Sequence, residues 1–171
     1  MKYSIIVPVF NRPDEVDELL ESLTRQTCKD FEVIVVEDGS QINCKDVCDK
    51  YANILDLHYY AKPNSGPGQS RNYGAERANG EWLIVLDSDV VLPDGYLQAV
   101  ENELREMPRG EYVLLKTFCR SARTRMPLFT DWGITLEEKY HIHERPIRDI
   151  EYMDVHELSL TIPLLVCYNV G

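Results

Sequence analysis

The sequence predicts an α/β protein with a doubly wound, mostly parallel β-sheet and helices on both faces. First, apolar runs of strand length alternate with helical stretches through short connections. Second, these runs are apolar at successive positions, as in strands covered on both faces. Third, polar residues follow the runs, where open α/β sheets bind ligands: Asn11, Asp38, Asp87 and Asp89. With 171 residues, 44% of them hydrophobic, the chain suits one globular domain.

The first strand is expected over residues 3–9, which are almost all apolar or β-branched. Pro8 lies at its end, where a missing N–H donor matters least. A helix follows, for which Asn11 is the expected cap and Pro13 part of the first turn. The helix has an apolar face at helical spacing, formed by Val16, Leu19, Leu20 and Leu23.

The same alternation continues through the next segment. Residues 31–36 repeat the buried-strand pattern and end in the polar residues 37–40. A helix is expected over residues 45–51 and a third strand over residues 55–60. Residues 62–68 contain two prolines and two glycines, so they are expected to form a loop.

A further helix, strand, helix and strand complete the regular part of the pattern. A helix is expected over residues 69–79, ended by a glycine, and a fourth strand over residues 81–86, which leads into the acidic segment 87–89. Residues 93–107 are expected to be helical and residues 111–118 to form a fifth strand.

The pattern weakens beyond about residue 119, where three prolines interrupt it. Here we expect only a short helix over residues 135–140 and a strand over residues 158–166.

The charge and the cysteines limit the function and the compartment. The formal net charge is −11, most of it within residues 1–110, which disfavours binding to nucleic acid. Such a surface can still bind an anionic nucleotide through a divalent cation. Five cysteines without paired spacing indicate free thiols in a reducing compartment. Because neither a signal peptide nor a membrane span is recognisable, we expect a cytoplasmic protein, which could work at the inner face of the cell membrane.

Asp87 and Asp89 place two carboxylates one residue apart at the end of a buried strand. In extended geometry such residues point the same way, so without a cation the carboxylates would repel each other. A hard divalent ion removes that cost and leaves positions for diphosphate oxygens. The alternative is a turn in which Asp87 caps the backbone and Asp89 is solvated.

Asp38 and Arg71 are two further candidates for a ligand site. Asp38 precedes a chain-turning glycine and can accept a hydrogen bond from a base or a ribose; alternatively, it stabilises the turn itself. Arg71 lies near the start of a helix and suits a phosphate group. Its alternative is a salt bridge with Asp38 or Asp87, which would still place it at the site.

Four segments together resemble family 2 glycosyltransferases with the GT-A fold. They are residues 4–11, 35–40, 64–72 and 80–89. The resemblance spans about residues 3–100 with the family's spacing, which makes it far more specific than the acidic segment alone.

The resemblance implies a nucleotide-sugar donor, usually a uridine diphosphate (UDP) sugar, a Mn or Mg ion, and transfer with inversion to a carbohydrate or lipid-linked acceptor. It implies metal ligation by Asp89, with Asp87 on the metal, its water or the ribose. It implies that Asp38 holds the uracil or ribose. The implied nucleotide contacts are Pro8, Val9, Phe10, Asn11, Asp38, Arg71, Asp87 and Ser88.

The resemblance also divides the chain into two parts of one domain. Residues 1–110 form the donor-binding half, and residues 111–171 form an incomplete or divergent acceptor-side segment. Family members carry an acidic motif there that supplies the catalytic base, and this chain does not match it well. Asp149 is our candidate base, with Glu151 and Asp154 nearby. A sheet without its remaining strands would favour self-association.

Two other functions are alternatives to a glycosyltransferase. A nucleotide-sugar-binding protein without transfer activity shares every donor motif, and only a base and an acceptor pocket distinguish it from an enzyme. A nucleotidyltransferase needs a glycine-rich, basic loop after the first strand, which residues 9–13 do not provide.

Overall fold

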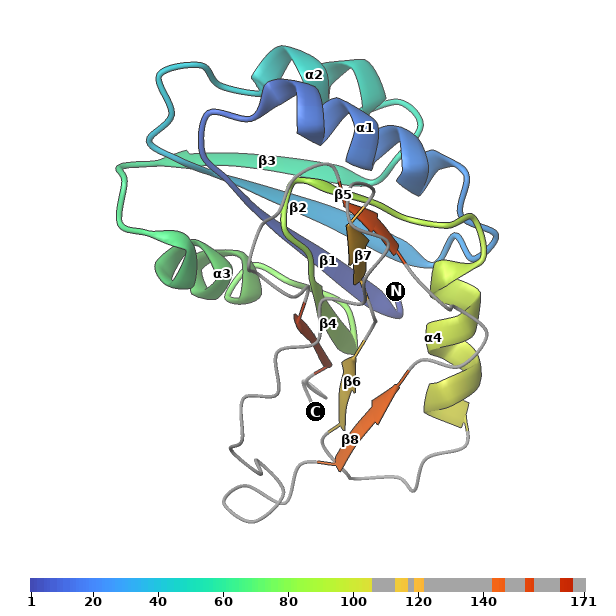
Figure 1. Cartoon of the computed structure of the whole chain (residues 1–171). Coiled ribbons are helices and arrows are strands. Elements are labelled where there is room, and N and C mark those ends of the chain that lie inside the picture. The colour runs from blue at the N-terminus through green and yellow to red at the C-terminus, as the bar shows by residue number, and fades with distance from the viewer. Residues whose placement is uncertain (106–112, 117–118, 122–142, 147–152, 156–163, 168–171) are drawn as a thin grey trace.

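The computed structural model has the predicted α/β architecture (Figure 1). It describes residues 1–105, 113–116, 119–121, 143–146, 153–155 and 164–167. Within these residues no helix combines the length and the apolar composition needed to cross a membrane. Cys28, Cys44 and Cys48 are free thiols, as predicted.

The central sheet has four parallel strands in the order β3-β2-β1-β4. These strands are β1 (Tyr3–Val9), β2 (Phe31–Asp38), β3 (Leu57–Lys62) and β4 (Trp82–Val85). Because all four run in the same direction, their carboxyl ends meet at one edge of the sheet. The register places Val9 opposite Glu37, and Asp38 opposite Lys62.

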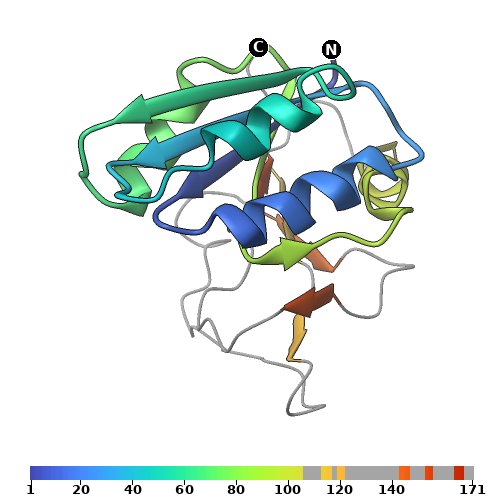
Figure 2. The same cartoon turned by 90° about the horizontal axis from the view of Figure 1, so that it is seen from above.

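Helices cover both faces of this sheet, as predicted (Figures 1 and 2). Helices α1 (Pro13–Thr24) and α2 (Lys45–Tyr51) lie on one face, and α3 (Pro67–Ala75) lies on the other. Helix α4 (Tyr96–Arg105) follows the short strand β5 (Val90–Val91).

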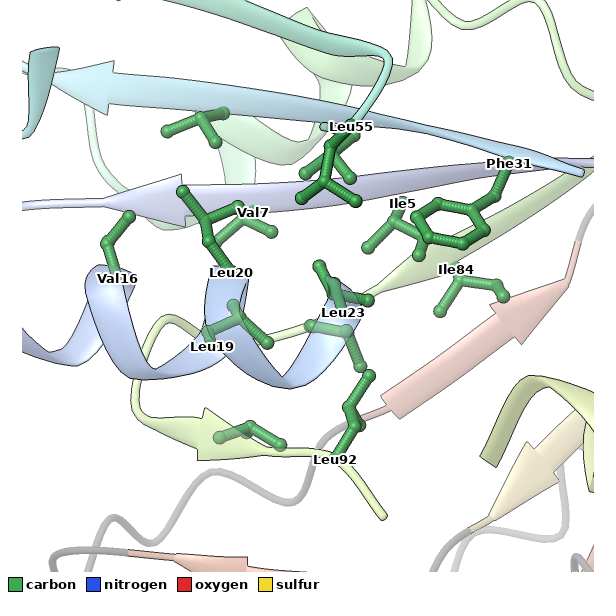
Figure 3. Packing of buried hydrophobic residues seen from close by; sticks show 14 of the residues in the cluster. Ile5, Val7, Val16, Leu19, Leu20, Leu23, Phe31, Leu55, Ile84 and Leu92 are labelled. Atoms are coloured by element: carbon green, nitrogen blue, oxygen red, sulfur yellow. The ribbon is translucent and has the colours of Figure 1, made fainter. Parts of the chain in front are cut away.

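The core between α1 and the sheet consists of the side chains that the helical spacing predicts. Val16, Leu19, Leu20 and Leu23 are all fully buried and belong to one cluster with Ile5 and Val7 of β1 (Figure 3). Burying each aliphatic side chain contributes about 1.5–3 kcal/mol. This packing holds the end of β1 and the start of α1 in place.

Helix α3 approaches the opposite face closely through Gly74. A Cβ atom at this position would lie 2.5 Å from Cγ2 of Ile6 and 3.3 Å from Cγ2 of Val36. Only a residue without a side chain fits this contact, which fixes the distance of α3 from β1 and β2.

Two small sheets complete the described structure. One has the order β5-β9-β7, with β9 at Met153–Val155 and β7 at Cys119–Ser121. The other has the order β10-β6-β8, with β10 at Leu164–Cys167, β6 at Val113–Lys116 and β8 at His143–Pro146.

The observed boundaries differ from the predicted ones in several places. Strand β3 begins two residues later than expected, and α3 covers residues 67–75 instead of 69–79. Pro67 starts α3, because proline suits the first helical turn, and α3 ends before the expected glycine. Residues 164–166 of the strand expected over residues 158–166 lie in β10 (Leu164–Cys167). Residues 158–163 and the helix expected over residues 135–140 lie outside the described residues.

Candidate functional site

A cavity of about 320 Å³ lies at the carboxyl edge of the central sheet. Its lining comes from the ends of β1, β2 and β4 and from the start of α3. The lining residues are Pro8, Val9, Phe10, Arg12, Asp38, Pro67, Asp87, Ser88 and Asp89. Seven of them are among the predicted site residues, and Arg12 and Pro67 are not. The sequence-predicted carboxylates therefore share one cavity.

Asn11 does not cap α1, contrary to the expectation. The cap position is Arg12, without a side-chain capping bond, and Asn11 has a left-handed backbone with φ 55°. The side-chain oxygen of Asn11 instead accepts hydrogen bonds from the backbone N–H groups of Gln41 (2.8 Å) and Ile42 (3.1 Å). Asn11 thus ties the end of β1 to the loop after β2, beside the cavity.

The buried carboxylate of Asp38 accepts hydrogen bonds from the loop before α3. The donors are the backbone N–H groups of Ser65 (2.9 Å) and Gly66 (2.8 Å), together with the ammonium of Lys62. Burial disfavours the charged form of Asp38, but these donors outweigh burial and hold its pKa below the ordinary value. Asp38 therefore stays ionised at neutral pH and fixes the loop over residues 63–66.

Arg71 of α3 reaches the end of β4. One of its terminal nitrogens lies 2.9 Å from Oδ1 of Asp87. This is the salt bridge that the sequence left open as an alternative, and it places the guanidinium beside a residue that lines the cavity. Arg71 itself is not among the lining residues.

Asp89 has a basic partner that the sequence analysis missed. Nη1 of Arg12 lies 3.0 Å from Oδ2 of Asp89, whose side chain is only 6% exposed. The signal for Arg12 was its position directly after the first strand, at the edge where ligands bind.

Each carboxylate at the cavity is therefore paired with a cation. Lys62, Arg71 and Arg12 neutralise Asp38, Asp87 and Asp89, respectively. The sequence predicted that Asp87 and Asp89 would repel each other without a cation, and in the structure each carboxylate has a guanidinium group as its cation. Lys62 was also missed, although it ends β3 directly opposite Asp38 in the parallel register.

The two carboxylates of residues 87 and 89 suit a divalent cation. Mg and Mn prefer oxygen ligands, and Mg is usually held by one or two carboxylates plus water and substrate phosphates. In the part of the chain that the structure describes, no group of three or more Asp, Glu, His or Cys residues could hold a metal ion. Water and diphosphate oxygens suit the remaining positions of such an ion.

The candidate base Asp149 and its neighbour Glu151 lie outside the described residues. Asp154 belongs to β9, which pairs with β5, and its register partner is Val91. Val91 is two residues beyond Asp89, so the pairing of β5 with β9 brings the backbone of Asp154 close to the acidic segment 87–89.

Comparison with protein families gives a match over most of the chain. The profile described as Glycosyl transferase family 2 matches residues 4–157. An uncharacterized glycosyltransferase of Haemophilus influenzae is 42% identical over 123 residues, which cover 68% of this chain and 39% of that protein. The poly(ribitol-phosphate) beta-N-acetylglucosaminyltransferase TarS of Staphylococcus aureus is 41% identical over 93 residues, 52% of this chain and 16% of TarS.

Solved structures agree with the fold. Residues 1–349 of TarS in complex with UDP-GlcNAc superpose with a TM-score of 0.66 and 32% identity, covering 74% of this chain and 36% of that one. The mannosyltransferase PcManGT of Pyrobaculum calidifontis, in complex with GDP-Man and Mn2+, has a TM-score of 0.61 at 21% identity, covering 70% of this chain and 36% of that one, and this likeness concerns the fold alone.

The chain spans less than two fifths of the length of these relatives. The profile match nevertheless covers nearly the whole chain. The GT-A-like sheet also brings the cavity-lining residues of the segments 4–11, 35–40, 64–72 and 80–89 to one edge. The chain therefore belongs to glycosyl transferase family 2.

Proposed function

We propose that this chain binds a UDP-sugar in the cavity at the carboxyl edge and transfers the sugar to a hydroxyl acceptor with inversion. One observation carries the proposal: Asp38, Asp87 and Asp89, predicted from two separate motifs, line the same cavity of about 320 Å³. The similarity to TarS, whose structure holds UDP-GlcNAc, supports a uridine nucleotide.

Asp38 is the proposed contact to the uracil or the ribose. A carboxylate offers about four acceptor positions. Within the described part of the chain, three are used by Lys62, Ser65 and Gly66, so about one remains for a ligand. A single remaining position suits a single donor, such as the imide N–H of uracil or a ribose hydroxyl.

The other proposed nucleotide contacts surround this position. Pro8, Val9, Phe10, Asp87 and Ser88 line the cavity, and Asn11 and Arg71 lie next to lining residues. Phe10 is half exposed and offers an aromatic face to a base or a sugar.

Asp89, together with Asp87, would hold a Mn or Mg ion. A divalent ion bound there supplies positive charge next to the departing diphosphate. The residues of the chain hold that ion, orient the nucleotide and keep the donor at the edge of the sheet.

Transfer also needs a base for the acceptor. A carboxylate takes the proton of the acceptor hydroxyl as its oxygen bonds to the anomeric carbon, and the bond to the diphosphate breaks on the opposite side. Asp149 remains our candidate base, and Asp154 is a second one because β9 pairs beside the acidic segment.

We further propose that residues 1–110 bind the donor and residues 111–171 face a carbohydrate or lipid-linked acceptor. In this view the chain works in the cytoplasm or at the inner face of the cell membrane, without nucleic acid. Self-association is proposed as well, because β3 forms one edge of the central sheet. Sedimentation that stays monomeric at every concentration would exclude it.

Calorimetric titration of UDP with Mn2+ and with EDTA tests the donor site. We expect clear binding with Mn2+ and much weaker binding with EDTA. Equal affinity under both conditions would contradict the metal-assisted site, and absence of binding under both would contradict the donor site.

A panel of UDP-sugars with candidate acceptors then separates an enzyme from a binding protein. Transfer over many turnovers identifies an enzyme, whereas tight binding without transfer favours the alternative, a nucleotide-sugar-binding protein. Asp149→Asn and Asp154→Asn should leave UDP binding unchanged, and the variant that loses transfer identifies the base.

A further inference from the structure

The carboxylate proposed to hold the metal ion is already engaged by a side chain of the same protein. Oδ2 of Asp89 lies 3.0 Å from Nη1 of Arg12, and the carboxylate is almost completely buried. A buried carboxylate without a nearby cation is costly, so Arg12 stabilises its ionised form. Any divalent ion that uses this carboxylate must compete with Arg12.

The exposure of Arg12 and a second acidic neighbour allow its side chain to move away from Asp89. Its side chain is 36% exposed, and the same Nη1 also lies 4.0 Å from Oε1 of Glu15. Arg12 is, moreover, one of the residues that line the cavity. It can therefore leave Asp89 while keeping its charge at the cavity.

We infer that Arg12 is the counter-ion of Asp89 in the metal-free protein and becomes a ligand of the donor's diphosphate when a divalent ion takes over Asp89. This inference rests on the proposed function. A guanidinium group binds phosphate oxygens with two parallel N–H donors, which makes diphosphate a suitable second partner. The exchange keeps every charge at the cavity paired: the ion with the carboxylate, and the guanidinium with the diphosphate.

The exchange predicts that removing the charge of Arg12 has opposite effects on the affinity for the metal ion and on the affinity for the nucleotide. Before the nucleotide arrives, Arg12 competes with the metal ion, so removing its charge should tighten metal binding. Once the ion is bound, Arg12 assists the nucleotide, so removing it should weaken nucleotide binding. A residue that only supports the local structure would weaken both.

The test compares Arg12→Gln with Arg25→Gln. Arg25 follows the end of α1, pairs with Glu21 and Asp94, and is not among the cavity-lining residues, so its variant has the same charge change away from the site. Binding of Mn2+ alone is measured from the electron paramagnetic resonance signal of free Mn2+. UDP binding at saturating Mn2+ is measured by calorimetry, and thermal melts confirm that each variant folds.

We expect Arg12→Gln to bind Mn2+ about twofold to fivefold more tightly than the wild type, as the loss of a partly exposed competing ion pair implies. Its UDP affinity at saturating Mn2+ should fall about tenfold, the size of one charge-assisted hydrogen bond. Arg25→Gln should change neither value, and Arg12→Lys should recover part of the UDP affinity.

Weaker Mn2+ binding by Arg12→Gln would overturn the exchange, because Arg12 would then support the metal site. Unchanged UDP affinity would remove Arg12 from the diphosphate. A wild-type chain that binds Mn2+ but no UDP would contradict the proposed function itself, and the Mn2+ titration of the two variants would still decide whether Arg12 competes for Asp89.

Discussion

Asp38 has two tasks, since it holds the loop before α3 and offers its remaining acceptor position to the ligand. Asp38→Ala should weaken uridine and UDP by the same factor, because the lost contact is to the base or ribose and not to phosphate. A buried hydrogen bond of this kind is worth about 1–3 kcal/mol. Calorimetry with both ligands checks this, and the exposed Asp56 provides the control variant Asp56→Ala. If only UDP weakened, Asp38 would act on the diphosphate or its metal ion.

Glu32 gives the fold an acid-sensitive contribution to stability. Its side chain is 1% exposed. Burial disfavours its charge, but donors from Ser4 (2.5 Å) and Asn79 (2.6 Å) outweigh burial and lower its pKa. Because the folded pKa lies below the unfolded value of about 4.5, this contribution is fully present above that pH and is lost as the pH falls through the folded pKa.

Urea unfolding between pH 3 and pH 7 tests this sign. The free energy of unfolding of the wild type should fall as the pH is lowered towards 3. For Glu32→Gln it should fall less over the same range, and it should be lower than the wild-type value at pH 7. Glu81→Gln, which changes an exposed glutamate, should follow the wild type. A Glu32→Gln curve parallel to the wild-type curve would contradict the role of this carboxylate.

The acidic site residues could be predicted, but their partners could not. Asp38, Asp87 and Asp89 each end an apolar run, and this local pattern is sufficient to place them at the carboxyl edge. Arg12 and Asp89 are 77 positions apart, and nothing in the sequence around either residue predicts their contact. Lys62 meets Asp38 only through the register of two parallel strands.

At the scale of elements, the two glycines of α3 should respond oppositely to alanine. At Gly74 a methyl group would lie 2.5 Å from Ile6, so Gly74→Ala should destabilise the protein by about 1–3 kcal/mol. At Gly68 the corresponding space is open, so Gly68→Ala should be neutral or stabilising by up to about 1 kcal/mol. Urea denaturation of both variants measures the difference. Equal stabilities would show that α3 shifts to accommodate the methyl group.

Element types were easier to predict than element ends. The apolar run of β1 gave boundaries that the structure confirms, and the periodic apolar residues of α1 gave the face of this helix that is buried. Helix α3 has a weakly periodic, polar sequence, so proline and glycine alone guided its prediction, and both ends were misplaced. Strand β2 continues through Asp38, two residues beyond its apolar run, because β1 and β3 pair with it there.

At the scale of the whole molecule, ligand binding should stabilise the fold. The cavity draws on β1, β2, β4 and α3, so it exists only when the sheet is complete. UDP with Mn2+ at about 100 times the dissociation constant should therefore raise the free energy of unfolding by about 2.7 kcal/mol. Thermal melts measure this shift, and Mn2+ with uridine at the same concentration should raise the melting temperature less. An unchanged melting temperature would place UDP outside the folded site.

The strand order β3-β2-β1-β4 also has a consequence for synthesis on the ribosome. Strand β1 is made first, but in the finished sheet it lies between two strands that follow it along the chain. Its second neighbour begins at Trp82, and at usual elongation rates the ribosome needs roughly 4–15 seconds to reach it from the end of β1. During that interval β1 has at least one side of its backbone unpaired. We therefore expect the nascent chain to be a target for chaperones that shield extended apolar segments until β4 has emerged.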